Sequence, residues 1–283
     1  MRTRIAPTPS GYLHVGNVFS FILTWIRARQ YGIQILLRID DADRLRKRPE
    51  YLDDIFRVLE WLQLDYDIGP SSVDDFEKNW SQIHRSSLYE NLLNKLFTHQ
   101  DVFACFCSRS QINSVHDETQ CACMNQSFDQ HLPHAWKINT KEHSISIPDV
   151  LAGHLQIPLS PFIIRQKNSE ASYQVSSLAD DIHFEISHIF RGEDLLESTG
   201  RQLFLDQIIG PSSFTKTHFY HHALVTGNDG GKLSKSAGAQ RQSLMKQFSK
   251  NEIMQAFGRW MNLPEPYPNN ISDWIEWMPR QVL

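Results

Sequence analysis

Residues 4–39 read RIAPTPSGYLHVGNVFSFILTWIRARQYGIQILLRI, and this stretch decides the fold class. It opens on a short apolar segment, Arg4-Ile5-Ala6, and continues into a turn rich in proline and glycine over residues 7–11. Apolar residues then recur on one helix face, ahead of a stop signal at Gly32: Phe19, Ile22, Leu23 and Ile26. Residues 33–39 form an apolar run that ends in charge, which is typical of a buried parallel strand. The stretch therefore predicts a strand, a helix and a second strand in succession.

A second amphipathic helix is predicted after this unit. Pro49 suits the first turn of a helix, and the apolar residues that follow it share one face: Leu52, Ile55, Val58, Leu59 and Leu62. Alternation of strands and helices at this pace is the pattern of an open parallel sheet covered by helices. We therefore predict an α/β fold.

Composition excludes several classes of protein. The chain has 283 residues, of which 41% are hydrophobic and 21% charged, so it is neither a disordered chain, nor a fibre, nor a disulfide mini-protein. No apolar run approaches the roughly 18 residues of a membrane span, and residues 1–7 lack the apolar core of a signal peptide. We expect a cytoplasmic protein. A net charge of −4 argues against broad electrostatic binding of nucleic acid and leaves room for a local basic groove.

Changes in composition along the sequence predict four segments. Residues 1–101 form the first half of the parallel-sheet domain, and residues 166–245 form its second half. Between them, residues 102–165 are rich in Cys, His, Gln, Asn and Ser and have only short apolar stretches, which indicates an insertion. Residues 246–283 form a helical tail that ends in a segment rich in Trp and Pro.

The insertion holds all four cysteines, in two close-set pairs. Cys105 and Cys107 form one pair, and Cys121 and Cys123 form the other. In a reducing compartment such clustering points to metal rather than to disulfides, and four thiolates suit tetrahedral zinc. A fully ligated ion would be structural, since no coordination position stays open. His116 is a spare candidate ligand, and four thiols without a metal are the alternative.

Two short motifs suit a nucleotide. His14-Val15-Gly16-Asn17 stands where the first helix is expected to begin, and a helix N-terminus favours phosphate. Lys232-Leu233-Ser234-Lys235-Ser236 follows a glycine-rich stretch and forms a cationic loop that would neutralise charge developing on pyrophosphate. Taken singly, the first motif is also compatible with a structural helix start, and the second with a solvated basic turn.

Together the two motifs resemble the paired signatures of the class I aminoacyl-tRNA synthetases, in particular the glutamyl subgroup. Further blocks along the chain resemble that subgroup: residues 4–16, Leu37-Arg38-Ile39-Asp40-Asp41-Ala42-Asp43-Arg44, Tyr173 with Asp180-Asp181, and Phe190-Arg191-Gly192-Glu193-Asp194-Leu195. The resemblance runs from Arg4 to about Gly238. It implies a class I synthetase fold of Rossmann type and a ligase.

The resemblance also implies a role for single residues. The glutamate pocket would be formed by Arg4, Thr8, Asp40, Tyr173 and Arg191. The ATP site would be formed by His14, Gly16, Asn17, Lys232 and Lys235, with His14 and the two lysines as catalytic residues. The chemistry fits, because a guanidinium pairs in bidentate fashion with a carboxylate and an acid suits the substrate ammonium. Mg²⁺ is expected with ATP.

Two residues depart from the subgroup's pattern. Asn17 stands where the motif usually ends in histidine, and it donates a hydrogen bond without carrying charge. Asp40 replaces the usual glutamate and is one methylene shorter. We expect it to reach the substrate ammonium through a water or a shifted substrate.

The expected partners are ATP, L-glutamate and tRNA, with no membrane, and we expect a monomer. The sequence ends soon after the lysine motif, whereas a discriminating glutamyl-tRNA synthetase needs a large anticodon-reading domain. The resemblance is thus to the short, zinc-bearing members of the family, which transfer glutamate to queuosine in the anticodon stem-loop of tRNA(Asp). Two alternatives stay open: charging of a tRNA 3′ end, and a non-catalytic paralogue that binds tRNA or an amino acid.

Overall fold

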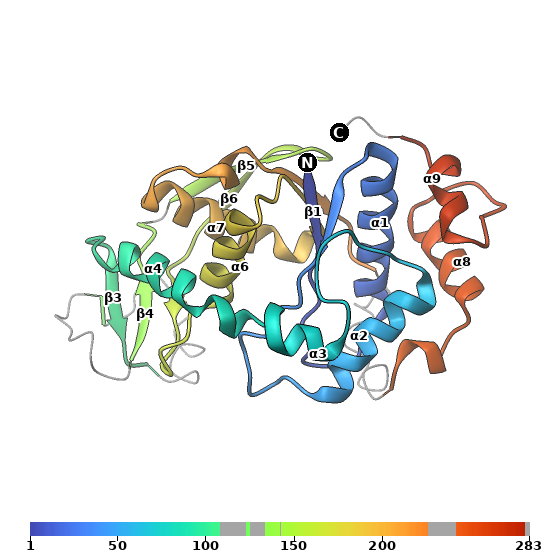
Figure 1. Cartoon of the computed structure of the whole chain (residues 1–283). Coiled ribbons are helices and arrows are strands. Elements are labelled where there is room, and N and C mark those ends of the chain that lie inside the picture. Colours follow the sequence, from blue (N-terminus) through green and yellow to red (C-terminus); the bar gives the residue numbers. More distant parts are fainter. Residues whose placement is uncertain (108–122, 125–133, 142, 226–241, 281–283) are drawn as a thin grey trace. The chain divides into compact units, whose positions relative to one another are not determined.

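The computed structural model describes residues 1–107, 123–124, 134–141, 143–225 and 242–280 (Figure 1). The lysines of the second motif, Lys232 and Lys235, lie outside the described residues, as do Cys121 and His116. The chain divides into two compact units. Unit 1 comprises Met1–His84, Ser187–Asp194 and His218–Leu283, and unit 2 comprises Arg85–Ile186 and Leu195–Thr217. The boundaries predicted for the four segments differ from those of the two units, and the division into four segments stays a prediction.

Unit 1 is built on parallel strands. Strand β1 (Arg2–Ile5) pairs in parallel with β2 (Gln34–Leu37), and β8 (His188–Gly192) pairs in parallel with β9 (His218–His222). The helices and short turns of this unit are α1 (Val15–Tyr31), α2 (Pro49–Leu62), α3 (Val73–Asp75), the π turn Phe76–Trp80, the 3₁₀ turns Leu244–Lys246 and Ile271–Asp273, α8 (Lys250–Trp260) and α9 (Trp274–Trp277). Two further 3₁₀ turns, Gln82–Arg85 and Glu193–Leu195, begin in unit 1 and end on a residue of unit 2. The predicted succession of strand, helix and strand over residues 4–39 is confirmed.

Strands β1 and β8 lie side by side. The Arg2 amide donates to Ser187 Oγ at 3.0 Å, and the Ser187 amide donates to the Arg2 carbonyl at 2.9 Å. Farther along, Arg4 Nη1 donates to the carbonyl of Phe190 at 3.5 Å. Residue numbers rise together on both strands, so β8 runs in the same direction as β1. The carboxyl ends of these parallel strands thus meet at one edge, which is where open α/β sheets bind their ligands.

The long helix α1 begins and ends as its sequence predicts. Gly32 follows it with φ of +63°, a left-handed conformation that glycine adopts without strain, and its amide donates to the Ala28 carbonyl. The strand predicted over residues 33–39 is shorter than expected, since β2 covers only Gln34–Leu37. After β2, the Arg38 amide donates to the Ile5 carbonyl at 2.9 Å, and the Asp40 amide donates to the Pro7 carbonyl at 2.9 Å. These bonds hold the segment after β2 against the segment after β1.

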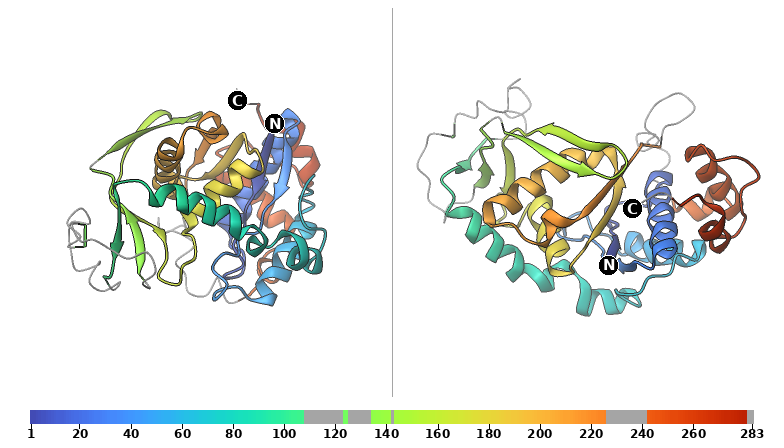
Figure 2. Two further views of the ribbon diagram at one scale, coloured as in Figure 1. Left: turned by 60° about the vertical axis from the view of Figure 1, so that its left-hand side comes forward. Right: turned by 90° about the horizontal axis from the view of Figure 1, so that it is seen from above.

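The C-terminal part of the chain packs on α1, where α8 and α9 (red) lie beside it in both views of Figure 2. Phe19 of α1 contacts the rings of Phe257 and Trp260, at centroid distances of 5.7 and 5.4 Å. Arg27, buried in α1, donates from Nη1 to the Pro279 carbonyl at 2.7 Å. The tail predicted to be helical over residues 246–283 contains α8, whose buried residues Ile253, Met254 and Phe257 belong to the hydrophobic core of unit 1.

Gly258 tests this packing, because it lies in α8 directly against the Tyr267 ring. A Cβ on Gly258 would stand 2.5 Å from Tyr267 Cδ1, and the ring is held by a 2.9 Å bond from its hydroxyl to the Leu263 carbonyl. Alanine gains about 1 kcal/mol of helix propensity over glycine, whereas overpacking costs about 1–3 kcal/mol. We expect Gly258→Ala to lower the free energy of unfolding in urea titrations. The exposed neighbour change Arg259→Ala should stay within about 0.5 kcal/mol of the parent, and a stabilised Gly258→Ala would show that the ring moves aside freely.

Unit 2 combines antiparallel strands with helices. Its strands are β3 (Val102–Cys105), β4 (Ala135–Ile138), β5 (Ser144–Asp149), β6 (Gly153–Pro158) and β7 (Phe162–Arg165). They pair in the order β3-β4-β7 and as the hairpin β5-β6. The helices are α4 (Ser86–Phe97), α6 (Tyr173–His183), α7 (Leu196–Ile209) and the 3₁₀ turn Ser213–Lys216.

A buried ion pair ties α4 to α6 inside unit 2. Arg85 makes two bonds to the Asp180 carboxylate, Nε to Oδ1 at 2.7 Å and Nη2 to Oδ2 at 3.0 Å, and the Tyr89 hydroxyl donates to the same carboxylate at 2.9 Å. Asp180 is fully buried, so a charge there requires such partners. This acid of the Asp180-Asp181 block therefore serves the interior of unit 2.

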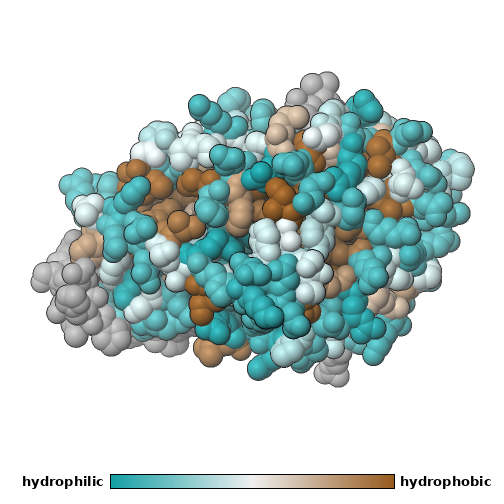
Figure 3. Space-filling model, viewed as in Figure 1, coloured by the Kyte–Doolittle hydropathy of each residue, from teal (hydrophilic) through white to brown (hydrophobic). Residues whose placement is uncertain are grey.

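On the face drawn in Figure 3, hydrophilic side chains cover most of the surface, with apolar side chains between them. Within the described ranges, no helix has both the length and the apolar character of a membrane span.

Candidate functional site

Helix α1 begins at a closed capping arrangement made by the first predicted motif. His14 is the N-cap residue, and its ring Nδ1 accepts from the Asn17 amide at 3.3 Å. In return the His14 amide donates to Asn17 Oδ1 at 3.2 Å. A Cβ at Gly16 would stand 3.0 Å from His14 Cε1, so glycine leaves room for the imidazole. The motif therefore places a histidine ring over the N-terminus of a 17-residue helix, where phosphate is favoured.

The strand edge of unit 1 carries two buried arginines. Arg4 lies in β1 and is 5% exposed, and Arg191 lies in β8 and is 3% exposed. The Cζ atom of Arg191 lies 5.8 Å from the centroid of the Phe219 ring on β9. Guanidinium groups stay charged in proteins, so this edge holds two positive charges with little access to water. Such groups suit a carboxylate ligand.

Asp40 faces a partner that the sequence analysis did not identify. Arg38 binds its carboxylate with two bonds, Nε to Oδ1 at 2.7 Å and Nη2 to Oδ2 at 3.0 Å, and both residues are buried. The two bonds from Arg38 fix the orientation of the Asp40 carboxylate. Asp40 thus stands beside the Pro7-Thr8 segment as an oriented acceptor, with Thr8 exposed next to it.

The next residue, Asp41, anchors the segment after β2 to the chain that follows α2. Its carboxylate accepts from the Ser81 hydroxyl at 2.7 Å and from the Gln82 amide at 2.8 Å. Lys47 Nζ completes the set at 3.1 Å. Asp41 is buried, and its carboxylate has these three partners. Its role is therefore structural: it holds the adjacent Asp40 in place.

Two further buried titratable groups lie near these motifs in unit 1. Burial lowers the pKa of His222, at the end of β9, although its bond to the Ala223 carbonyl and the carboxylates of Asp194 and Glu193 raise it. Burial raises the pKa of Asp54 in α2, while the Ser243 hydroxyl and the Leu13 amide lower it. The bond to the Leu13 amide thus places the Asp54 carboxyl one residue from His14, the N-cap residue of α1.

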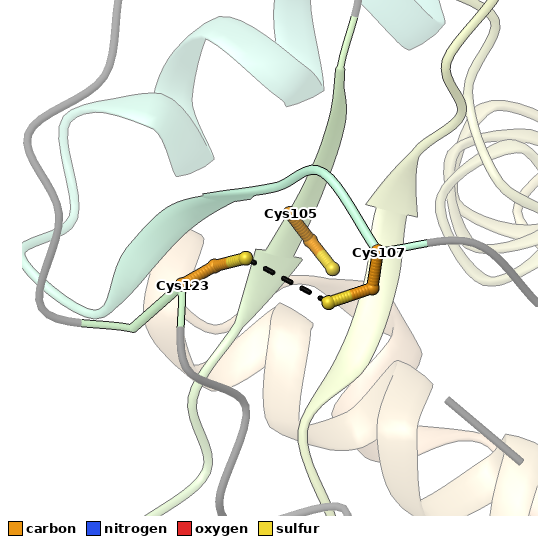
Figure 4. Close-up of side chains that lie close together, drawn as sticks. All are labelled: Cys105, Cys107 and Cys123. Atoms are coloured by element: carbon orange, nitrogen blue, oxygen red, sulfur yellow. Dashed lines mark hydrogen bonds between the residues drawn. The ribbon is translucent and has the colours of Figure 1, made fainter. Parts of the chain in front are cut away.

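The cysteines gather in unit 2, where Figure 4 shows the side chains of Cys105, Cys107 and Cys123 converging. Their three sulfur atoms lie within 4.8 Å of one another, and Cys107 Sγ is 3.7 Å from Cys123 Sγ. Strand β3 ends at Cys105, so the chain delivers two of these thiols from one turn. Cys105 and Cys123 are buried, and Phe103 and Met124 pack around the cluster.

The geometry of this cluster fits tetrahedral zinc. With Zn–S bonds of about 2.3 Å, sulfurs at two corners of a tetrahedron lie about 3.8 Å apart. The observed 3.7 Å between Cys107 and Cys123 matches that edge. Thiolates are the ligands that structural zinc prefers.

Comparison with known families decides the class of the protein. The family "tRNA synthetases class I (E and Q), catalytic domain" matches residues 1–257. The chain belongs to this family. It is therefore a class I synthetase of the ligase type, with an α/β fold on a parallel sheet.

Two curated relatives of this chain carry different names. The glutamyl-Q tRNA(Asp) synthetase of Symbiobacterium thermophilum is 32% identical over 83% of this chain and 78% of that protein. The glutamate–tRNA ligase 2 of Syntrophus aciditrophicus is 30% identical over 84% of this chain, but the match spans only 52% of the relative. Both support glutamyl-Q synthetase or glutamyl-tRNA ligase-like activity.

Solved structures agree on the fold. The glutamate–tRNA synthetase of Elizabethkingia anophelis matches with a TM-score of 0.68 at 21% identity, over 83% of this chain and 52% of that chain. A glutamate–tRNA ligase of Elizabethkingia meningosepticum, in complex with its amino acid, matches with a TM-score of 0.66 at 21% identity, over 84% and 52%. This synthetase chain spans about half the length of these ligases.

The predicted site residues divide between the two units. Unit 1 contains one group at the carboxyl edge of its strands and at the start of α1: Arg4, Thr8, His14, Gly16, Asn17, Asp40 and Arg191. Unit 2 contains Tyr173, which is 40% exposed at the start of α6, and the described cysteines. The roles given to these residues stay predictions.

Some residues of the synthetase site escaped the sequence analysis although a signal was present. Arg38 and Asp40 are two apart on an extended segment, and such residues share a face. The opposite charges of Arg38 and Asp40 at this spacing could therefore have predicted their ion pair. Asp54 offered a weaker signal, a lone acid near the apolar face of an amphipathic helix, with nothing local to name its partners.

Proposed function

We propose that the chain activates glutamate with ATP and transfers it to queuosine in the anticodon of tRNA(Asp). The observation that carries the first half is the pair of buried arginines on neighbouring strands, beside an oriented aspartate. The second half is supported by the glutamyl-Q tRNA(Asp) synthetase of Symbiobacterium thermophilum, most of whose length the match covers.

The pocket discriminates by charge. A guanidinium from Arg4 or Arg191 pairs with the glutamate side-chain carboxylate, and a neutral isostere such as glutamine leaves a buried cation unsatisfied. Asp40, oriented by Arg38, takes the substrate ammonium. Thr8 completes the part of the pocket that unit 1 supplies.

The first step forms the adenylate. An oxygen of the glutamate α-carboxylate attacks the α-phosphorus of ATP, the bond to the β-phosphate oxygen breaks, and pyrophosphate leaves. His14, the free amides at the start of α1, Lys232 and Lys235 neutralise the charge on the phosphates, with Gly16 and Asn17 shaping the helix start. Mg²⁺ enters as part of the ATP substrate.

The second step transfers the glutamyl group. A hydroxyl of the queuosine ring attacks the adenylate carbonyl, an ester forms, and AMP leaves with the bonding electrons of the acyl–oxygen bond. The proton of the attacking hydroxyl passes to the departing phosphate or to water, and no residue is assigned as a general base. Zinc, held by Cys105, Cys107, Cys123 and Cys121, would supply structural order near unit 2's short sheet and take no part in either step.

A second function, charging of a tRNA 3′ end, is favoured by the nearly equal similarity to a glutamate–tRNA ligase. Both functions share the first step and differ only in the acceptor. The acceptor is therefore the quantity to measure.

Glutamate-dependent exchange of pyrophosphate into ATP tests the proposal, run with and without tRNA. Exchange without tRNA, followed by transfer of labelled glutamate to queuosine-containing tRNA(Asp), is expected. Labelling of an unmodified tRNA(Glu) transcript would select the 3′-charging ligase instead. A folded protein that exchanges under no condition would be a binding paralogue, a reading that Asn17 and Asp40 motivate.

Lys235→Ala is expected to slow this exchange by about 10²- to 10³-fold, the scale of losing one preorganised donor to a developing oxyanion. The effect should fall on kcat rather than on the glutamate KM, because the charge develops in the transition state. Lys246→Ala removes an exposed lysine eleven residues downstream and should leave the rate unchanged. An exchange rate within a few-fold of the parent would remove Lys235 from the mechanism.

A further inference from the structure

The cap of α1 is made by an unusual residue. N-caps are commonly Ser, Thr, Asp or Asn, whereas here a histidine ring takes that place. The ring does so with a definite atom, since Nδ1 is the acceptor for the Asn17 amide at 3.3 Å. The Asn17 side chain closes the box from the other side, with Oδ1 accepting from the His14 amide at 3.2 Å.

This contact determines where the proton of the neutral ring lies. A neutral imidazole has one donor nitrogen and one acceptor nitrogen, and the bond made by one decides the state of the other. An Nδ1 that accepts from a backbone amide carries no hydrogen, so the hydrogen is on Nε2.

The same box leaves Asn17 occupied. Its oxygen is committed to the His14 backbone, so its part is directed at His14 rather than at a ligand. Gly16 reinforces the arrangement, because a Cβ there would lie 3.1 Å from His14 Nδ1 and press on the ring. Two of the other three motif residues, Gly16 and Asn17, thus hold His14 in place: the Asn17 amide bonds the His14 ring, and the Asn17 side chain bonds the His14 backbone.

We propose that Asn17 is a positioning residue, which locks His14 as the Nε2–H tautomer so that its Nε2 donates to a phosphate oxygen at the start of α1. The phosphate part rests on the proposed function, whereas the tautomer part concerns the protein alone. Asn17 then substitutes for a charged motif histidine by fixing a neutral donor.

Nitrogen-15 NMR of histidine-labelled protein tests the tautomer without reference to activity. The chain has 13 histidines, so the His14 signals are assigned by their loss in His14→Gln. At neutral pH the parent should show a protonated Nε2 and a bare Nδ1. Asn17→Ala should give averaged shifts of the two tautomers, and Asn17→Gln, which restores a box-closing amide, should recover the parent pattern.

A second box in the same unit provides the matched control. Helix α8 begins with Ser249 and Glu252 in the same reciprocal arrangement. Glu252→Ala removes an equivalent cap and should leave both the His14 tautomer and the exchange rate unchanged. Asn17→Ala should slow pyrophosphate exchange about five- to tenfold, the scale of one hydrogen bond, and Asn17→Gln should restore it.

Two results would overturn the proposal. A parent His14 with hydrogen on Nδ1 would contradict the tautomer, and an Asn17→Ala protein with unchanged shifts or an unchanged exchange rate would remove the positioning role. Absence of exchange in the parent, with the expected tautomer present, would instead count against the proposed function and its phosphate ligand.

Discussion

Arg191→Ala is expected to lower kcat/KM for glutamate by about 10²- to 10⁴-fold, because truncating one partner of a buried charge pair costs about 3–5 kcal/mol. The arginine is 3% exposed and lies at the strand edge where we propose that glutamate binds, so water cannot replace it. The loss should appear as a raised glutamate KM with a much smaller change in the ATP KM. Steady-state pyrophosphate exchange, varied in each substrate, measures the two constants.

Arg27→Ala is the matched control, since it also deletes a buried guanidinium from unit 1. Arg27 bonds to Gln30 and to the Pro279 carbonyl, at 2.8 and 2.7 Å, and so holds the C-terminal segment on α1. Its loss should lower Tm and leave the glutamate KM near the parent value. Arg191→Lys should fall between the parent and alanine, because lysine keeps the charge and loses the planar fork. If both KM values rise equally in Arg191→Ala, the arginine serves the scaffold.

The parts of the fold that sequence reasoning predicted are those with a strong local period. The helix of residues 19–26 and the helix around Leu52–Leu62 both bury their apolar faces. The parallel pairing of β1 with β2 follows from the buried apolar run of residues 33–39, which lies between these two helices in the sequence. The contact of β8 with β1 is different. It joins residues more than 180 positions apart, and no local pattern specifies such a neighbour.

The site divides in the same way. Motif residues at the ends of strands were predicted by type and position, as Arg4, Asp40 and Arg191 illustrate. Their electrostatic partners were not, since pairing depends on how loops fold back. Arg38 neutralises Asp40, and Asp180, quoted for its resemblance, is instead engaged with Arg85 and Tyr89.

His14 and Asn17 show the limit most clearly. The sequence analysis assigned both to ATP and treated Asn17 as an uncharged departure from the motif. Hydrogen-bond direction, which no sequence pattern specifies, joins the two residues to each other.

Cysteine replacement is the second change with a large expected effect. Structural zinc in small sites contributes about 10–16 kcal/mol of apparent binding free energy at neutral pH. We expect freshly purified protein to contain about one zinc per chain, and chelation to destabilise unit 2. Metal analysis and thermal unfolding measure both, and less than half an equivalent of zinc would contradict the site.

The pattern across single variants separates a metal centre from a set of buried thiols. With zinc bound, Cys105→Ser, Cys107→Ser and Cys123→Ser each remove one ligand and should destabilise by similar amounts, with loss of the metal. Without zinc, exposure alone would decide the cost. Cys105 is 1% exposed, whereas Cys107 is only partly buried, so Cys107→Ser would then stay within about 0.5 kcal/mol of the parent. Equal, large losses at all three positions would therefore identify a shared ion, because burial differs among the three side chains and would give unequal losses without one.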